Sequence, residues 1–456
     1  MRRYFVVALL LAICQSVGWA ADRKPAVEAL VQPAIDQAYA VGMVVGILED
    51  GRTQVFAFGK TAAGGKAPDA RTIFEIGSIS KVFTASTLAA MAEKKLLSLD
   101  DPVRKYLPAG AGIPAAPEGA KEIALLDLAT QSSGLPRMPD NFRPADPANP
   151  YADYSPAKLY EFLARQTLVK KPDAKYLYSN VGMGLLGHVL ELRAGKPYGD
   201  LVVETIARPL GMADTQVQLS ADLKSRLAQG HSGDGDPVAN WDLTALAGAG
   251  ALRSTVTDML KFVAANLDPP PSLAAAFKNA HTIRAPLGPS GGNIALAWHV
   301  KPNGIYWHNG GTAGYTSYAS FNPQNKTGVV VLINTSGSLM NEIGARLESM
   351  LAGESHEPLK LKSSVTLAPE VLDRYAGVYD MGPAKLTVRR NGNRLLGQIT
   401  GQPTFRVYPE SETEFFLKVV DARITFTKDE QGAVTGLVLH QGGRDRPAKR
   451  VSEPRP

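Results

Sequence analysis

A serine and a lysine stand three residues apart, at Ser78 and Lys81, where an extended segment is predicted to run into a helix. The preceding residues 71–76 include β-branched and aromatic side chains typical of strands, and apolar residues recur at helical spacing from residue 82 to 91. We therefore expect Ser78 at a helix N-terminus, with Lys81 one turn later on the same side. A lysine whose pKa is lowered by burial can accept the serine proton, so this pair predicts a nucleophile.

The same spacing occurs again at Ser155-Pro156-Ala157-Lys158, where it has a structural explanation. Ser155 is predicted to be the N-cap of a helix and Pro156 its first residue. A serine and a lysine at this spacing are therefore not diagnostic alone. The structural alternative for Ser78 is likewise a helix N-terminus without catalysis, and other motifs must decide between the two.

Two further motifs follow in the chain. Tyr178-Ser179-Asn180 precedes an apolar run of helical length; its tyrosine can relay a proton, and its asparagine amide can hold a substrate carbonyl. His308-Asn309-Gly310-Gly311 follows a strand-like segment, and its glycines allow a substrate to approach so that a carbonyl meets the Gly311 N–H. The structural alternatives are a core tyrosine beside an asparagine N-cap, and a glycine-rich hairpin with an incidental histidine.

Taken in this order, the three motifs resemble those of one family: the serine β-lactamases of class C and the related penicillin-binding proteins, D-aminopeptidases and carboxylesterases. Three longer stretches carry the same resemblance, at residues 74–84, 125–136 and 248–259, and it covers roughly residues 25 to 350. It implies an α/β fold in which an antiparallel sheet is flanked by helices and joined to a helical subdomain. The active site is then expected in the cleft between the two parts.

The resemblance also implies a role for each motif residue. Ser78 attacks a carbonyl and becomes acylated, while Lys81 and Tyr178 share its proton and Tyr178 passes the proton to the leaving nitrogen. The backbone N–H groups of Ser78 and Gly311 form the oxyanion hole. Water then hydrolyses the acyl-enzyme, and no cofactor or metal is expected. The residues expected to bind the substrate are Asn180, His308 and Gly310.

Two positions depart from the class C pattern. The third motif reads His308-Asn309-Gly310 where class C enzymes usually have Lys-Thr-Gly, so a histidine that is mostly neutral at pH 7 replaces a permanent cation for the substrate carboxylate. Arg137-Met138 stands where class C enzymes carry a polar glutamine. The histidine leaves room for an esterase or a peptidase. The Ser-Asp-Asn motif of class A enzymes is absent, which argues against that class.

Other chemistries lack support in the sequence. Gly288-Pro289-Ser290-Gly291-Gly292 matches Gly-x-Ser-x-Gly, but it lies in a proline- and glycine-rich loop and not between a strand and a helix. The chain has no His-Glu-x-x-His motif and its seven histidines are scattered, so no metal site is predicted. With 49 basic and 43 acidic residues the formal charge is only +6, and no basic run indicates nucleic-acid binding.

The N-terminus is typical of a secretory signal peptide, which we place at residues 1–20. Arg2 and Arg3 precede an apolar stretch too short to span a membrane, and small residues precede Ala21. A periplasmic or secreted protein is therefore expected. The one cysteine, Cys14, lies in this segment, so the mature chain has no disulfide and must depend on its core.

The remaining chain divides into three expected segments. Residues 21–353 form the hydrolase domain, in which strands from both ends of the segment enclose a helical insert. Residues 354–366 form a linker. From residue 367 to 456, short β-like runs separated by turns such as Asn391-Gly392 predict a small all-β barrel, which resembles a lipocalin. The strands expected late in the hydrolase domain are 295–300, 305–308, 316–321 and 329–334.

Three functions compete. The leading hypothesis is a serine hydrolase that forms an acyl-enzyme on Ser78 and cleaves the amide of a β-lactam or of a D-Ala-type cell-wall peptide. A carboxylesterase or D-aminopeptidase on the same scaffold is the alternative, and His308 favours it. A non-catalytic binding protein is opposed by the intact Ser78, Lys81 and Tyr178. The expected partner is a small-molecule or peptide substrate; no membrane span is predicted, and the oligomeric state is open.

Overall fold

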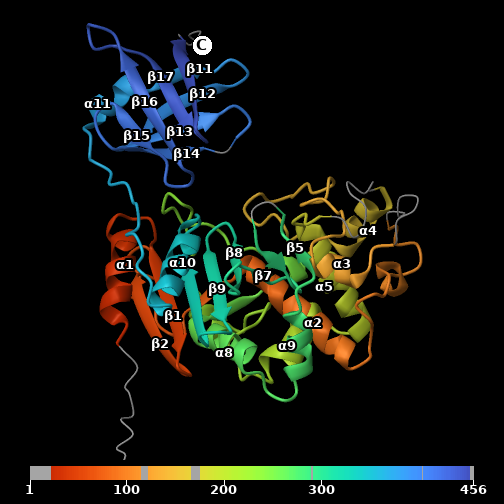
Figure 1. The fold of residues 1–456 in the computed structure, drawn as a ribbon. Helices are drawn as coiled ribbons and strands as arrows, with labels where there is room; N and C mark the ends of the chain where they lie inside the picture. Colours follow the sequence, from red (N-terminus) through yellow and green to blue (C-terminus); the bar gives the residue numbers. More distant parts are fainter. Residues whose placement is uncertain (1–21, 114–121, 166–174, 289–290, 403, 452–456) are drawn as a thin grey trace, which may run out of the picture.

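The structure, a computed structural model, describes residues 22–113, 122–165, 175–288, 291–402 and 404–451. The predicted signal peptide and Pro289-Ser290 lie outside these ranges. An α/β domain comes first and a closed barrel of eight strands follows it, in agreement with the predicted fold class. In Figure 1 the barrel lies above the part of the α/β domain that holds α1 and α10, and a connecting segment joins the two. Within the ranges above, no helix has the length and apolar character needed to cross a membrane.

An antiparallel sheet of eight strands forms the centre of the α/β domain, in the order β2-β1-β10-β9-β8-β7-β6-β5. Strands from both ends of the domain meet where β1 pairs with β10, with Val44 opposite Leu332. Strands β3 (Ile73–Glu75) and β4 (Arg253–Thr255) form a separate pair, and β3 leads into the turn that carries Ser78. The strands of the large sheet are β1 (Gly42–Glu49), β2 (Arg52–Gly59), β5 (Ala285–Pro286), β6 (Asn293–Ile294), β7 (His299–Val300), β8 (Tyr306–Gly311), β9 (Thr316–Asn322) and β10 (Thr327–Ile333).

Of the expected strand at 295–300, only the last two residues form a strand, as β7, whereas the other three expected strands occur as β8, β9 and β10 with small shifts of their ends. Residues 295–298 form a turn between β6 and β7, in which Ala295 N donates to Trp298 O at 2.9 Å. Ala297 has a φ angle of 59°, which a strand does not allow. The side chains of this turn are buried, and a buried turn shows the same apolar run as a buried strand.

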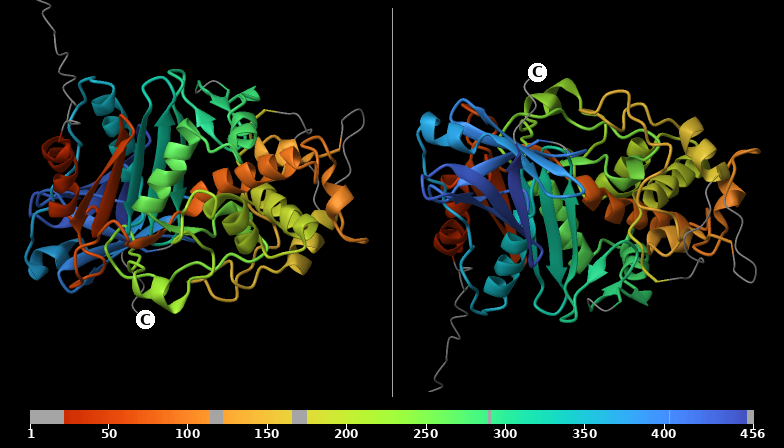
Figure 2. Two further views of the ribbon diagram at one scale, coloured as in Figure 1. Left: turned by 90° about the horizontal axis from the view of Figure 1, so that it is seen from below. Right: turned by 90° about the horizontal axis from the view of Figure 1, so that it is seen from above.

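Both faces of the large sheet are covered, which explains why its central strands are almost wholly apolar. Val44 of β1 packs into the core shared with the helical part, while Met43 and Val45 pack into the second core against α1 and α10. In Figure 2 the red helix α1 and the cyan helix α10 lie on one side of the sheet, and the green helix α8 lies on the other. The helices of this domain are α1 (Lys24–Asp36), α2 (Ser80–Glu93), α3 (Leu125–Ala129), α4 (Pro156–Arg165), α5 (Asn180–Ala194), α6 (Tyr198–Val202), α7 (Ala221–Ser225), α8 (Val256–Leu267), α9 (Ala274–Ala280) and α10 (Leu339–Leu351).

The barrel strands pair antiparallel in chain order, and β18 closes on β11. Aromatic rings of Tyr375, Phe415 and Phe426 help to fill the interior. The β-like runs of the sequence correspond to the six strands β12 to β17, whereas no run indicated β11 or β18. These runs are residues 385–389, 394–399, 404–408, 414–419, 423–427 and 434–440. In β18 only Ala448 is buried and Pro447 interrupts the pattern, so alternation is hard to detect. The elements are α11 (Pro369–Tyr375), β11 (Gly377–Asp380), β12 (Lys385–Asn391), β13 (Arg394–Ile399), β14 (Phe405–Pro409), β15 (Glu414–Phe416), β16 (Ala422–Lys428), β17 (Val434–Gln441) and β18 (Arg444–Val451).

One carboxylate of the α/β domain, that of Asp234, binds the barrel directly. It accepts hydrogen bonds from Arg406 N at 2.9 Å and from Tyr408 OH at 3.1 Å. Asp236, two residues later, instead forms an exposed ion pair with Arg394 at 3.0 Å. Both carboxylates therefore contact the barrel, but the hydrogen bonds of Asp234 are partly buried whereas the ion pair of Asp236 is exposed.

Asp234→Ala is expected to loosen the barrel, because it leaves two partly buried donors without their acceptor at a cost of about 1–3 kcal/mol each. Limited proteolysis of the connecting residues 354–366 should then become several-fold faster. The matched variant Asp236→Ala removes only an exposed ion pair, worth about 0–1 kcal/mol, and should cleave at the wild-type rate. Equal rates of proteolysis in the two variants would contradict the role of Asp234 in holding the barrel.

Candidate active site

Ser78 lies in a single turn of 3-10 helix, Gly77–Ile79, that connects β3 to α2. Ser78 therefore lies two residues before Ser80, the first residue of α2, which is a small departure from the expected position at the helix N-terminus. Gly77 has a φ angle of 48°, and a Cβ placed on it would lie 2.7 Å from Gly311 N. Only glycine fits here, because a side chain would push the turn away from β8.

Three of the predicted residues meet at Ser78 Oγ. Lys81 Nζ donates a hydrogen bond to it at 2.9 Å, and Tyr178 OH donates at 2.8 Å. Lys81 Nζ also donates to Ala249 O at 2.7 Å, which holds the ammonium in place. One serine hydroxyl thus faces two groups that can take up its proton, which is the arrangement an activated nucleophile requires.

Lys81 is completely buried, with 0 % of its surface exposed. Burial lowers the pKa of Lys81 because the ammonium loses hydration, whereas the adjacent Tyr178 acts in the opposite direction. The lowered pKa increases the share of neutral amine near pH 7, the form that can act as a base.

Strand β8 lies directly against the turn that carries Ser78. A Cβ on Gly310 would lie 2.0 Å from Ile76 O, so a side chain has no space at this position. Ser317 Oγ, on the neighbouring β9, donates to Ile76 O at 2.8 Å and ties the turn to the sheet. Gly311 lines the same pocket as Ser78. The oxyanion hole formed by the N–H groups of Ser78 and Gly311 stays a prediction that this arrangement allows.

His308 lies beside the site but is buried, with only 1 % of its surface exposed. Its ring stacks on that of His299 at a centroid distance of 5.1 Å, and its Nδ1 lies 2.6 Å from Asn309 O. Burial lowers the pKa of His308 well below its usual value, and the neighbouring His299 and Lys81 add to this. His308 is therefore neutral at pH 7 and supplies no cation. Its contact with a substrate stays a prediction.

Asn180 is the first residue of α5, and Ser179 is the N-cap, contrary to the asparagine cap considered above. Ser179 Oγ accepts a hydrogen bond from Gly182 N at 2.8 Å. The Asn180 side chain is therefore not used for capping; it lines the pocket, with Nδ2 3.5 Å from Met138 Sδ. This position is compatible with the predicted contact to a substrate carbonyl.

A small pocket opens at Ser78, and its aromatic wall was not predicted. Tyr151 and Trp241 form this wall, with ring centroids 5.1 Å apart. Trp241 N donates to Glu75 Oε1 at 3.0 Å, and Arg253 donates to both Glu75 Oε1 and Trp241 O. Tyr151 and Trp241 come from loops far apart in the chain, so no local pattern indicated them.

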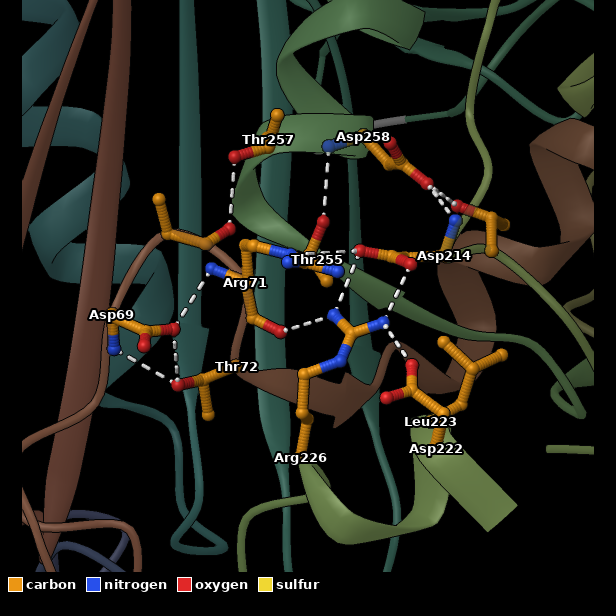
Figure 3. A network of polar contacts seen from close by, with 12 residues as sticks. Asp69, Arg71, Thr72, Asp214, Asp222, Leu223, Arg226, Thr255, Thr257 and Asp258 are labelled. Carbon is orange, nitrogen blue, oxygen red and sulfur yellow. Dashed lines mark hydrogen bonds and ion pairs between the residues drawn. The ribbon is translucent and has the colours of Figure 1, made fainter. Parts of the chain in front are cut away.

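A polar network supports the segment that leads into β3 (Figure 3). Arg226 donates to Asp214 Oδ1 at 2.6 Å and to Arg71 O at 2.9 Å, and the hydrogen bond from Arg226 lowers the pKa of Asp214. Thr257, at the start of α8, donates to Ala70 O at 2.8 Å. The chain before β3 is thereby bound to two other parts of the domain. Among the residues that the structure describes, no group of three or more acidic, histidine or cysteine side chains is placed to hold a metal ion.

Comparison with known proteins places this site in a family. Residues 27–353 match the Beta-lactamase family, and residues 361–450 match DUF3471, a domain of unknown function that corresponds to the barrel. The chain belongs to the beta-lactamase family. It is therefore a serine hydrolase of the β-lactamase and penicillin-binding family.

Among relatives, this beta-lactamase family protein is 26% identical over 357 residues to a beta-lactamase of Pseudomonas fluorescens, covering 69% of this chain and 94% of that protein. It is 29% identical over 320 residues to the D-alanyl-D-alanine-carboxypeptidase/endopeptidase AmpH of Escherichia coli, covering 65% of this chain and 80% of that protein. The structure of the D-alanine carboxypeptidase AmpC from Burkholderia cenocepacia matches with a TM-score of 0.62 and 26% identity, covering 72% of this chain and 98% of that chain. These matches confirm a class C β-lactamase-like fold.

Proposed function

We propose that this protein is a serine hydrolase of the class C β-lactamase or D,D-peptidase type, which forms an acyl-enzyme on Ser78 and cleaves an amide of a β-lactam or of a D-Ala-type peptide. One observation carries the proposal: Ser78 Oγ accepts hydrogen bonds from both Lys81 Nζ at 2.9 Å and Tyr178 OH at 2.8 Å. The names of the relatives, beta-lactamase and D-alanyl-D-alanine-carboxypeptidase, support this substrate class.

In the proposed reaction, Ser78 Oγ attacks the carbonyl carbon while its proton passes to the Lys81 and Tyr178 pair. The N–H groups of Ser78 and Gly311 stabilise the resulting oxyanion. The C–N bond then breaks as Tyr178 passes a proton to the leaving nitrogen, and an ester on Ser78 remains. Water attacks this ester, the same pair takes the water proton and returns one to Ser78 Oγ, and the acid product leaves.

A carboxylesterase or D-aminopeptidase is the second candidate, and the state of His308 favours it. His308 is buried and neutral, so it cannot neutralise a substrate carboxylate as the lysine of class C enzymes would. A neutral ester needs no such cation. The same nucleophile, base and oxyanion hole serve either reaction, so the choice depends on how the substrate is held.

We further infer that the protein is exported, from the signal-peptide pattern at residues 1–20, and that it acts in the periplasm or is secreted. The domain limits 21–353, 354–366 and 367–456 are part of the same proposal. The C-terminal domain is proposed to be lipocalin-like, since its strands pair antiparallel in chain order and close into a barrel.

The intact mass of the mature protein after mixing with benzylpenicillin tests this function. A transient adduct with turnover is expected for a β-lactamase, and a persistent adduct for a D,D-peptidase inhibited by its substrate mimic. No adduct, with hydrolysis of p-nitrophenyl esters intact, would favour the esterase or D-aminopeptidase. No adduct with benzylpenicillin or a fluorophosphonate would refute both and favour a binding protein.

A further inference from the structure

Arg137 brings a permanent positive charge to the active site. Its side chain is exposed, and its guanidinium carbon lies 5.0 Å from the ring centroid of Tyr178, whose hydroxyl binds Ser78 Oγ. The other cationic candidates cannot serve a substrate in this way, because Lys81 is buried beneath Ser78 and His308 is buried and neutral.

The main chain around Arg137 is fixed to the second motif. Arg137 O accepts a hydrogen bond from Asn180 N at 2.9 Å, and Pro136 O accepts one from Ser179 Oγ at 2.7 Å. Two bonds to adjacent motif residues hold this segment against the site. Arg137 therefore stands at a defined position next to Tyr178, and its main chain is hydrogen-bonded to Asn180, which lines the pocket at Ser78.

In the part of the chain that the structure describes, the guanidinium of Arg137 forms no hydrogen bond or ion pair, and it contacts the Tyr178 ring. Arg143, on the same segment, instead donates to Asp140 O and Phe142 O. A free guanidinium offers a planar pair of N–H donors that fits a carboxylate with two parallel hydrogen bonds. Burial lowers the pKa of Lys81, and the positive charge of Arg137 lowers it further. This effect is consistent with a position of Arg137 close to the reacting groups.

We propose that Arg137 recognises a carboxylate of the substrate and so determines specificity for anionic acyl donors. This inference rests on the proposed function of Ser78, and it assigns to Arg137 the cation that class C enzymes are expected to carry at the position of His308. Unlike a buried histidine, a guanidinium stays charged at every physiological pH. The carboxylate belongs either to the acyl part or to the leaving group, and matched substrates distinguish the two.

Three aryl esters of similar size test the proposal. p-Nitrophenyl valerate is neutral, p-nitrophenyl hemiglutarate carries a carboxylate on its acyl part, and m-carboxyphenyl valerate carries one on its leaving group. Arg137→Gln is expected to lower kcat/KM for one of the two anionic esters by about 10- to 100-fold, as the loss of a charge-assisted hydrogen-bond pair predicts. The rate with the neutral ester should change by less than about two-fold.

Two variants serve as controls. Arg137→Lys keeps the charge and should recover part of the loss, while Arg143→Gln removes the same charge from an exposed position on the same segment and should change none of the three rates. An equal loss with all three esters, or no loss with either anionic ester, would overturn the role of Arg137. If the wild-type protein hydrolyses no ester at all and forms no adduct, the proposed function of Ser78 fails instead.

Discussion

Ser78→Ala is expected to abolish acylation and to lower kcat/KM by on the order of 10⁴-fold or more, since it removes the atom that attacks the substrate. In the folded protein, the hydrogen bonds from Lys81 Nζ and Tyr178 OH both converge on Ser78 Oγ. Intact mass after treatment with a fluorophosphonate, together with rates on p-nitrophenyl esters, measures the loss.

The chain provides a matched control at the second serine and lysine with this spacing. Ser155 precedes α4, where its Oγ accepts a hydrogen bond from Lys158 N at 3.4 Å, and Lys158 Nζ pairs with Asp153 at 2.7 Å. Ser155→Ala should lose an N-cap worth about 1 kcal/mol and keep full activity. Acylation of the Ser78→Ala variant, or its loss in Ser155→Ala, would show that the wrong serine has been identified.

Lys81→Met is expected to slow acylation by about 10²- to 10⁴-fold, the usual contribution of a positioned general base. Methionine fills the volume of the buried side chain but cannot accept the proton of Ser78 Oγ. The rate of adduct formation in a single turnover measures this step separately from deacylation. Near-wild-type acylation would mean that Tyr178 acts as the base without the lysine.

The same substitution should have a pH-dependent effect on thermal stability. Burial lowers the pKa of Lys81 in the folded protein below its usual value of 10.5, so protonated Lys81 opposes folding below the folded-state pKa. This opposition fades as the pH rises towards 10.5. The melting temperature of Lys81→Met relative to wild type should therefore be highest at acidic to neutral pH and fall as the pH rises.

One opposing effect limits the increase in the melting temperature of Lys81→Met. Lys81→Met leaves Ala249 O without its donor, at a cost of about 1–3 kcal/mol that does not depend on pH. The sign of the change with pH, and not the absolute melting temperature, is therefore the test. A difference in melting temperature that stays constant or grows with pH would contradict a lowered pKa for Lys81.

Local signals in the sequence predicted several elements well. Asp50-Gly51 is a local hairpin signal, and it forms the turn between β1 and β2 with positive φ angles of 52° and 71°. The spacing of Ser78 and Lys81 places both on one side of the first helical turn, where they form a hydrogen bond. Tyr178 lies 100 residues away from Ser78, and only the resemblance to a family connected the two in advance.

Other features were missed because they depend on distant parts of the chain. The turn at residues 295–298 has an apolar sequence because it is buried, and burial is decided by the elements packed around it. The aromatic wall of Tyr151 and Trp241 joins two loops separated by about ninety residues of sequence. Neither loop has a periodic pattern that would place it at a particular site.

By itself, the sequence determined which side chains can carry the chemistry, namely a serine, a lysine and a tyrosine in family motifs, and which glycines border them. Only the tertiary structure decided the electrostatic state of the site. It buries His308 against His299 and makes it neutral, while Arg137 stays exposed beside Tyr178 without a carboxylate partner among the described residues. The physical reason is that charge state and accessibility depend on desolvation by groups that folding brings together from distant parts of the chain.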